Sequence, residues 1–302
     1  MLRLLAGHPT FEVVAASAAR RAGQAMEAVL PHLRGTPGAF VSTAEALSTR
    51  ADVCFSCLPS GSEVARSADS PLVIDLADTH RADPAWTYGL PEMNRSAIRD
   101  AGRVANPGCY PTAVQLALVP FVRAGVVGDE AIVDAVSGVS GAGRRDEDRL
   151  LFSNLAGDMT AYGSGVHRHV PEMETGLARY GGADVKVSFT PHLAPIARGL
   201  LATCRMRLTT ALDDDGALSV MADAYADERF ITVSPAWPAP KAVTGTNRVH
   251  LSARVDNRTG WLIASAALDN LGKGAAGQAI QNANLAAGLP ETMGLGAVGV
   301  WP

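Results

Sequence analysis

The chain has 302 residues, of which 47% are hydrophobic and 19% charged, and its net charge is −4. This length suggests two domains or one large α/β domain, with enough apolar residues for a sizeable core. A pI near 6.0 gives no reason to expect nucleic acid or an anionic membrane as a partner. No apolar run reaches transmembrane length, no signal peptide is evident, and four cysteines make no disulfide framework. We therefore expect a cytoplasmic protein.

The first hundred residues alternate short apolar runs with helical ones. Buried parallel strands are predicted over 11–18, 51–59 and 71–78, where apolar residues are bounded by turn residues. Helices are predicted between them, over 22–33 and 43–47. This βαβ rhythm predicts a Rossmann-like, doubly wound α/β nucleotide domain.

The start of the chain lacks the usual opening of such a domain, which is a strand, a glycine-rich turn and a helix. The first residues, MLRLLAGHP, have the character of the end of that first helix. We therefore expect the first strand and the glycine-rich loop, about 20 residues, to be missing from this chain.

From Ala131 onward the pattern changes to closely spaced β-rich segments. They cover 131–143, 185–208, 230–236, 247–257 and 261–270. Few helices separate them, which predicts a second, α+β domain with a mixed or mostly antiparallel sheet covered on one side. The last strand continues into a helix rich in Ala and Gly.

A cysteine stands in a rigid turn of the sequence NPGCYPTA. Pro107 and Pro111 restrict the backbone on either side of Cys109, and Gly108 permits a bend that other residues resist. If 112–123 is a helix, Cys109 lies just before its N-terminus, where partial positive charge favours the thiolate. The pattern favours a nucleophile over an inert loop cysteine.

A nucleophilic cysteine needs a base, and His167 and His169 are the obvious candidates. Two residues apart, they share a face if the segment is extended, and Glu172 follows closely as an orienting carboxylate. Polar residues at a strand edge are the plainer interpretation. A zinc site is weakly supported, because H-x-H has no further ligands at usable spacing. We expect no metal.

Two further segments offer anion-binding groups. The segment 137–145 carries three glycines, two serines and two arginines, which can form an anion cradle or simply a flexible turn. Arg198 lies near a predicted strand, where it could clamp a substrate carboxylate or serve a local network.

Six motifs in chain order resemble those of the N-acetyl-gamma-glutamyl-phosphate reductase family, in the semialdehyde-dehydrogenase superfamily. They are YGLPEMNR (88–95), NPGCYPTA (106–113), SGVSGAGR (137–144), HRHVPE (167–172), PHLAPIARG (191–199) and the segment 269–295, beginning DNLGKGAAGQA. They span nearly the whole chain. The last segment and the cysteine motif are the most specific.

The resemblance implies an activity in arginine biosynthesis. Cys109 would attack N-acetyl-gamma-glutamyl phosphate and expel phosphate, leaving a thioester that hydride from NADPH reduces to N-acetylglutamate 5-semialdehyde. A histidine of the H-R-H motif, His169 in preference to His167, would serve as acid/base. Phosphate recognition would fall to the loop of residues 137–144. The expected substrate-binding residues are Ser137, Ser140, Gly141, Arg144, Glu172 and Arg198.

The resemblance also implies an architecture. Residues 1–108 and 270–302 would form the dinucleotide-binding domain, and 109–269 the catalytic and dimerisation domain of a homodimer or homotetramer. Asn270 would approach the nicotinamide, and Gly274 would permit close packing. The expected cofactor-binding residues, for NADPH or NADP⁺, are Ser17, Arg20, Pro59, Gly108, Asn270 and Gly274.

One departure from the family pattern and three alternatives remain. The segment VIDLADTHRA differs from the usual D-L-S-A-D-F-R, with one residue fewer and a histidine near the aromatic position. A related acyl-phosphate reductase, of the aspartate-semialdehyde or lysine-pathway type, is one alternative. A non-catalytic, truncated paralogue is another, and a cofactor-free hydrolytic cysteine enzyme is the third.

Overall fold

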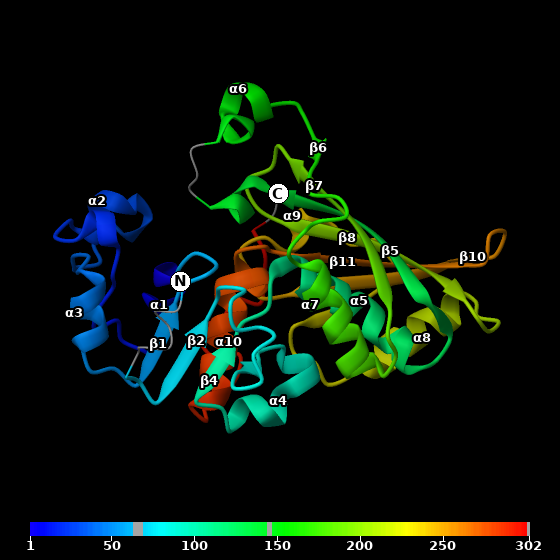
Figure 1. Cartoon of the computed structure of the whole chain (residues 1–302), viewed down its shortest axis with the longest axis horizontal. Coiled ribbons are helices and arrows are strands. Elements are labelled where there is room, and N and C mark those ends of the chain that lie inside the picture. Colours follow the sequence, from blue (N-terminus) through cyan, green and yellow to red (C-terminus); the bar gives the residue numbers. More distant parts are fainter. Residues whose placement is uncertain (63–68, 144–146, 301–302) are drawn as a thin grey trace. The chain divides into compact units, whose positions relative to one another are not determined.

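The computed structural model describes residues 1–62, 69–143 and 147–300, and its chain forms two compact units (Figure 1). The first unit comprises Met1–Asn106 and Ala276–Leu295, and the second comprises Pro107–Ala275 and Gly296–Pro302. Compactness does not identify what each unit binds. The functional division at 108/109 and 269/270 therefore stays a prediction.

The first unit is built on a four-stranded parallel sheet with strand order β1-β2-β4-β3. Its strands are β1 (Val53–Ser56), β2 (Leu72–Asp75), β3 (Thr87–Tyr88) and β4 (Arg103–Ala105). Its helices are α1 (Leu2–Leu5), α2 (Met26–Val29), α3 (Thr43–Ser48), α4 (Pro91–Arg99) and α10 (Gly277–Ala286).

The core of this unit lies between the central strands and α10. Ile74 and Val104 are fully buried against Ala279 and Ala283, whose small side chains let the helix approach the sheet closely. The strands predicted over 51–59 and 71–78 are confirmed by β1 and β2, and so is the Rossmann-like α/β class.

Two expectations for the N-terminal part were wrong. Residues 11–18 form no strand but only an isolated bridge from Ser17 to Val41, because no described segment supplies them with a backbone ladder. The helix predicted over 22–33 shrinks to α2 and a 3₁₀ turn at Pro31–Leu33, because Pro31 has no N–H to continue a helix.

The second unit is a seven-stranded mixed sheet with strand order β6-β7-β5-β8-β11-β10-β9. Its strands are β5 (Val127–Gly138), β6 (Thr160–Ala161), β7 (Lys186–Ala194), β8 (Leu200–Leu208), β9 (Ile231–Val233), β10 (Val249–Asp256) and β11 (Trp261–Leu268). Its helices are α5 (Cys109–Arg123), α6 (Phe152–Leu155), α7 (Val170–Gly176), α8 (Asp214–Ala224) and α9 (Pro240–Val243).

Most neighbours in this sheet run antiparallel, which confirms the α+β domain with a mixed, mainly antiparallel sheet. Only β5 with β7 and β9 with β10 are parallel. In Figure 1, α5, α7 and α8 lie along the sheet, and α5 contacts β5, β8, β10 and β11. Burial alternates along β5, with Val133 buried and Ile132 40% exposed.

Candidate active site

Cys109 is the first residue of α5, and its turn comes from the local sequence. Gly108 is the N-cap in an extended conformation, and the N–H of Thr112 donates to its carbonyl at 3.0 Å. The helix therefore begins three residues earlier than the expected Thr112, because Pro111 is tolerated in a first turn whose N–H groups need no helical acceptor. Cys109 is half-buried at this helix N-terminus, where the partial positive charge favours a thiolate.

Glu172 fixes the peptide just before the cysteine. Its Oε1 accepts a hydrogen bond from the Gly108 N–H at 2.9 Å, and its backbone carbonyl accepts one from Gln115 Nε2 at 3.3 Å. The carboxylate predicted to bind substrate thus holds the turn that presents Cys109. The substrate-binding role of Glu172 stays a prediction.

Gly274 packs directly against the nucleophile. A Cβ added at Gly274 would lie 2.8 Å from the Cβ of Cys109 and 3.1 Å from Leu268 Cδ1. Only glycine allows this approach without displacing a neighbour. The structure thus supplies a packing reason for a residue that was expected among the cofactor-binding groups.

The two histidines lie together, although not on an extended segment. Residues 163–169 form turns that lead into α7, and the His167 and His169 ring centroids are 4.9 Å apart. His169 is buried, and its N–H donates to His167 Nδ1 at 3.2 Å. The turn, rather than the alternation of a strand, brings the rings to one side. The condition of an extended segment is therefore not met, although the two rings do lie close together.

An aromatic side chain next to the cysteine contacts both histidines. The Tyr110 ring centroid lies 5.8 Å from that of His167 and 6.0 Å from that of His169. The Tyr110 hydroxyl is 3.1 Å from the Tyr162 hydroxyl, and burial raises the pKa of Tyr110, so the phenol stays protonated. Neither tyrosine was singled out from the sequence, although Tyr110 directly follows the nucleophile.

Burial also sets the charge state of His167. Desolvation, with a smaller effect from Arg168, lowers the pKa of His167 to about 4. The ring is therefore neutral at neutral pH. Because Nδ1 accepts the His169 N–H, the proton of this ring sits on Nε2, which is a hydrogen-bond donor.

Three backbone amides of the second glycine-rich segment, residues 137–145, donate to a neighbouring loop. The N–H groups of Gly138, Val139 and Ser140 donate to the carbonyls of Gly199, Ile196 and Ala197. These amides are thus not available to a phosphate. The expected site residue Arg144 lies outside the described residues.

Two serines and a glycine of this loop lie close together. Ser137 is buried and its hydroxyl donates to the Gly138 carbonyl at 3.2 Å. A Cβ added at Gly141 would lie 3.2 Å from Ser137 Oγ and 3.4 Å from Asn270 Nδ2. Asn270 Nδ2 itself donates to Ser140 Oγ at 2.9 Å. Ser137, Ser140, Gly141 and Asn270 are thereby brought together.

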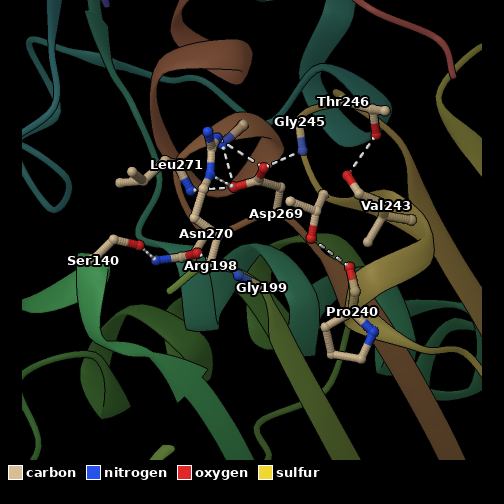
Figure 2. Close-up of polar contacts among 12 residues, drawn as sticks. Ser140, Arg198, Gly199, Pro240, Val243, Gly245, Thr246, Asp269, Asn270 and Leu271 are labelled. Carbon is tan, nitrogen blue, oxygen red and sulfur yellow. Dashed lines mark hydrogen bonds and ion pairs between the residues drawn. The ribbon is translucent and has the colours of Figure 1, made fainter. Parts of the chain in front are cut away.

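Arg198 pairs with a buried carboxylate that sequence reasoning missed. Figure 2 shows Asp269 accepting from Arg198, with Nε at 3.2 Å from Oδ1 and Nη2 at 2.8 Å from Oδ2. Asp269 also accepts the N–H groups of Leu271 and Gly272. An aspartate two and three residues before such N–H groups is a helix-start signal, which could have revealed it.

The other expected cofactor residues lie in the first unit. Ser17 and Pro59 are exposed, and Pro59 follows the carboxyl end of β1, the edge at which parallel α/β sheets bind ligands. Arg20 is exposed in a 3₁₀ turn, and it has no ion-pair partner in the part of the chain that the structure describes. A free guanidinium and a hydroxyl fit the phosphate ester of a dinucleotide.

Two general features of the chain complete the description. Among the described residues, no three His, Cys, Asp or Glu side chains gather as a metal site would require. None of the described helices is long and apolar enough to cross a bilayer.

Comparison with protein families first gives the class. The model of the semialdehyde dehydrogenase NAD-binding domain matches residues 1–101, and the model of the semialdehyde dehydrogenase dimerisation domain matches residues 109–270. Solved structures agree in fold. Aspartate semialdehyde dehydrogenase II of Vibrio cholerae, complexed with ASA, has a TM-score of 0.73 at 18% identity and covers 95% of this chain and 94% of its own. The enzyme of Candida albicans with NADP has a TM-score of 0.70 at 17% identity, covering 93% of each chain.

Curated relatives give the particular family. N-acetyl-gamma-glutamyl-phosphate reductase of Acidothermus cellulolyticus is 46% identical, and that of Frankia casuarinae 45% identical, each over 100% of this chain and 95% of the relative. The chain belongs to the N-acetyl-gamma-glutamyl-phosphate reductase family, which consists of oxidoreductases of the semialdehyde dehydrogenase class.

Proposed function

We propose that this protein reduces N-acetyl-gamma-glutamyl phosphate to N-acetylglutamate 5-semialdehyde and phosphate, with NADPH as the reductant, in arginine biosynthesis. The observation that carries the proposal is Cys109 at the N-terminus of α5, beside Tyr110, whose ring contacts both His167 and His169. Sequence identity of 45–46% to reductases of this name supports the substrate.

The nucleophilic step needs only modest help from the protein. An acyl phosphate is an activated electrophile, and the helix N-terminus favours the Cys109 thiolate that attacks its acyl carbon. The Cys109 Sγ–carbon bond forms as the carbon–oxygen bond to phosphate breaks, which leaves a thioester. Glu172 acts on this step by holding the Gly108 peptide in place.

The proton steps fall to the two histidines. When bound, the dinucleotide supplies the hydride that converts the thioester to a thiohemiacetal oxyanion. We assign His169 as the group that protonates this oxygen and later takes the proton back as the aldehyde leaves and the thiolate returns. His167, neutral with its proton on Nε2, serves as a hydrogen-bond donor to the oxyanion.

The two units divide these tasks in the proposal. The first unit, whose sequence matches an NAD-binding domain, binds the dinucleotide through Ser17, Arg20 and Pro59. Arg20 and Ser17 make NADPH the preferred reductant, because their side chains can bind the 2′-phosphate of its adenosine ribose. NADH lacks this phosphate. The second unit supplies the nucleophile and binds the acyl phosphate through Ser140 and Arg198.

We further propose a homodimer in which two copies pair through the second unit. Its sequence matches a dimerisation domain. Residues on one side of the sheet lie in register from β7 to β10, with exposed or half-exposed side chains that alternate with buried ones. This row consists of Ser188, Ile132, Arg205, Ile263 and Arg254. Sedimentation velocity, with Ile132→Lys as the interface variant, tests the assembly.

A substrate comparison tests the reaction. The wild-type chain should oxidise NADPH with N-acetyl-gamma-glutamyl phosphate, and turn over far more slowly with β-aspartyl phosphate. In reverse, N-acetylglutamate 5-semialdehyde should reduce NADP⁺ only when phosphate is present. A preference for β-aspartyl phosphate would establish the aspartate-semialdehyde alternative. NADPH binding, followed by fluorescence, with no turnover of either substrate would contradict the proposed reaction, and absence of binding in an intact dimer would support the non-catalytic alternative.

A further inference from the structure

Asp269 joins four backbone or side-chain groups from three parts of the second unit. Its carboxylate is fully buried and accepts from Arg198 and from the N–H groups of Gly245 and Leu271 (Figure 2). It also accepts the N–H of Gly272, and these bonds measure 2.5 to 3.2 Å. A buried carboxylate is stable only when it is paired and hydrogen-bonded, and this one satisfies both conditions. The loops that carry Arg198 and Gly245 therefore depend on it.

Asn270 extends the same connection to the glycine-rich loop. Its Oδ1 accepts the Gly199 N–H at 2.7 Å, while Nδ2 donates to Ser140 Oγ at 2.9 Å. Figure 2 shows Ser140, Asn270 and Gly199 linked beside the Asp269–Arg198 pair. The two consecutive residues thus hold both candidate anion-binding side chains, Arg198 and Ser140.

The backbone carbonyl of Asp269 is linked to the nucleophile through Gly274. Its carbonyl accepts the N–H groups of Gly272 and Gly274, at 3.0 and 2.9 Å. Gly274 is the residue whose Cα approaches the Cβ of Cys109. Asp269 therefore fixes two things: the turn whose Gly274 packs against the thiol of Cys109, and the orientation of the Arg198 guanidinium.

Arg198 keeps part of its guanidinium available. Nε and Nη2 are engaged by Asp269, its side chain is 26% exposed, and Nη1 has no partner among the residues that the structure describes. A side-on pair of this kind fixes the plane of the guanidinium, so the remaining N–H groups have one orientation.

We infer that Asp269 is a positioning residue that holds Arg198, and through Asn270 also Ser140, to receive an anionic group of the substrate. The inference rests on the proposed function for the identity of that substrate. The anion is either the phosphate or a carboxylate of the acyl phosphate, and both present oxygens that a guanidinium and a hydroxyl recognise.

Asp269→Asn is the informative change. The amide is isosteric, but its NH₂ must replace either Oδ1, which accepts from Arg198 Nε, or Oδ2, which accepts from Arg198 Nη2. The guanidinium loses its side-on pair in both orientations. We expect the Kd of inorganic phosphate or of N-acetylglutamate, measured by calorimetry on the full chain, to rise about tenfold. The KM of the acyl phosphate should rise by a similar factor, with a smaller change in kcat.

Two further variants separate positioning from support of the fold. Asp213→Asn makes the same change at the exposed N-cap of α8, where the carboxylate accepts the Gly216 N–H at 2.8 Å, and should leave both Kd values unchanged. Arg198→Gln combined with Asp269→Asn removes the buried charge imbalance. This double variant should regain the melting temperature lost in Asp269→Asn but not the anion affinity.

The outcomes are distinct. A lower melting temperature with unchanged Kd values in Asp269→Asn would overturn the inference, and so would a double variant that regains affinity. A wild-type chain that binds neither probe would also overturn it. If Asp269→Asn weakens anion binding while the wild-type chain fails to turn over the acyl phosphate, the inference stands and the proposed function falls.

Discussion

The first fifty residues and helix α5 are held in place by very different amounts of core. Of the fifty, the side chains recorded as buried are those of His8, Met26, Leu33 and Phe40, whereas α5 buries every residue from Tyr110 to Val122. The candidate nucleophile therefore begins an element packed on all sides. The candidate cofactor residues Ser17 and Arg20 lie where packing is sparse.

The contrast in packing matches the positional precision that each contact requires. A thiol must keep its position relative to its electrophile to within a fraction of an ångström. The helix that carries Cys109 is accordingly buried, and Gly108 and Gly274 lie directly beside the cysteine. A cofactor phosphate contact through an exposed arginine works by charge and tolerates movement. Five changes, in order of decreasing expected effect, test this contrast.

Replacing the nucleophile has the largest effect. Cys109→Ser should lower kcat at least ~10³-fold, because a serine hydroxyl at this position is not ionised and forms no thioester. Phosphate-dependent oxidation of the aldehyde measures it. Cys57→Ser, at an exposed cysteine, should keep full activity. Near-normal turnover of Cys109→Ser would refute the mechanism.

The second largest effect is expected from Gly274→Ala, which adds one methyl group beside the thiol of Cys109. Gly274→Ala should lower kcat roughly 10- to 100-fold, since the added Cβ lies 2.8 Å from the Cβ of Cys109 and must displace it. Gly7→Ala is the control, because a Cβ there meets nothing within 4 Å. Equal kcat values for the two variants would show that the thiol can shift without cost.

Matched valines compare the two regions directly. Val114 in α5 is fully buried and Val14 is 60% exposed. Val114→Ala should lower the free energy of unfolding by about 2 kcal/mol, through lost burial and a residual cavity. Val14→Ala should change it by less than ~0.5 kcal/mol. Urea denaturation measures both, and similar losses would contradict the contrast in core.

Removing the exposed charge of Arg20 should weaken the binding of NADPH and nothing else. Arg20→Ala should raise the KM of NADPH about tenfold and leave the KM of NADH and the stability unchanged, because it removes a charge-assisted contact to the 2′-phosphate. Arg21→Ala, at the adjacent exposed arginine, is the control. An equal effect on NADPH and NADH would assign Arg20 to a shared part of the cofactor.

The smallest effect is a pH dependence of stability. Unfolded histidine takes up a proton below its ordinary pKa of about 6.5, whereas His167 in the folded chain stays neutral until about pH 4. The stability that neutral His167 supplies is therefore present above pH 6.5 and is lost as the pH falls to 4.

His167→Asn should consequently lose less stability than the wild-type chain over this window, by on the order of 1 kcal/mol after solvent screening is considered. Urea denaturation at a series of pH values measures the difference. His32→Asn, at an exposed histidine, should show the wild-type slope. If the free energy of unfolding of His167→Asn has the same pH dependence as that of the wild-type chain, His167 takes up its proton at the same pH in the folded and unfolded states. That result would contradict the prediction.

Local patterns predicted the elements that carry their own signals. The strands β1 and β2 follow apolar runs bounded by turn residues, and α5 follows a proline-containing turn. The apolar run at 11–18 has the same composition yet forms no strand, since a strand also needs a neighbour to pair with. Composition cannot reveal whether that neighbour exists.

The candidate site divides in the same way. Cys109, His167 and His169 were identified because their residue types and spacing are distinctive. Asp269 was missed, because an aspartate at the end of a strand looks like any turn residue until Arg198 is seen beside it. The sequence also predicted an anion cradle over 137–145, but the amides of Gly138, Val139 and Ser140 donate to residues 196–199, which only pairing in space reveals.

The restricted turn of Cys109 at the start of a helix follows from sequence alone, because proline and glycine act on their own backbone and its immediate neighbours. The surroundings of the thiol, in contrast, depend on tertiary packing. Glu172 on its preceding peptide, Gly274 against its Cβ and Asp269 behind Gly274 come from distant parts of the chain. Contacts of that kind follow from packing and from the pairing of buried polar groups, which local patterns do not encode.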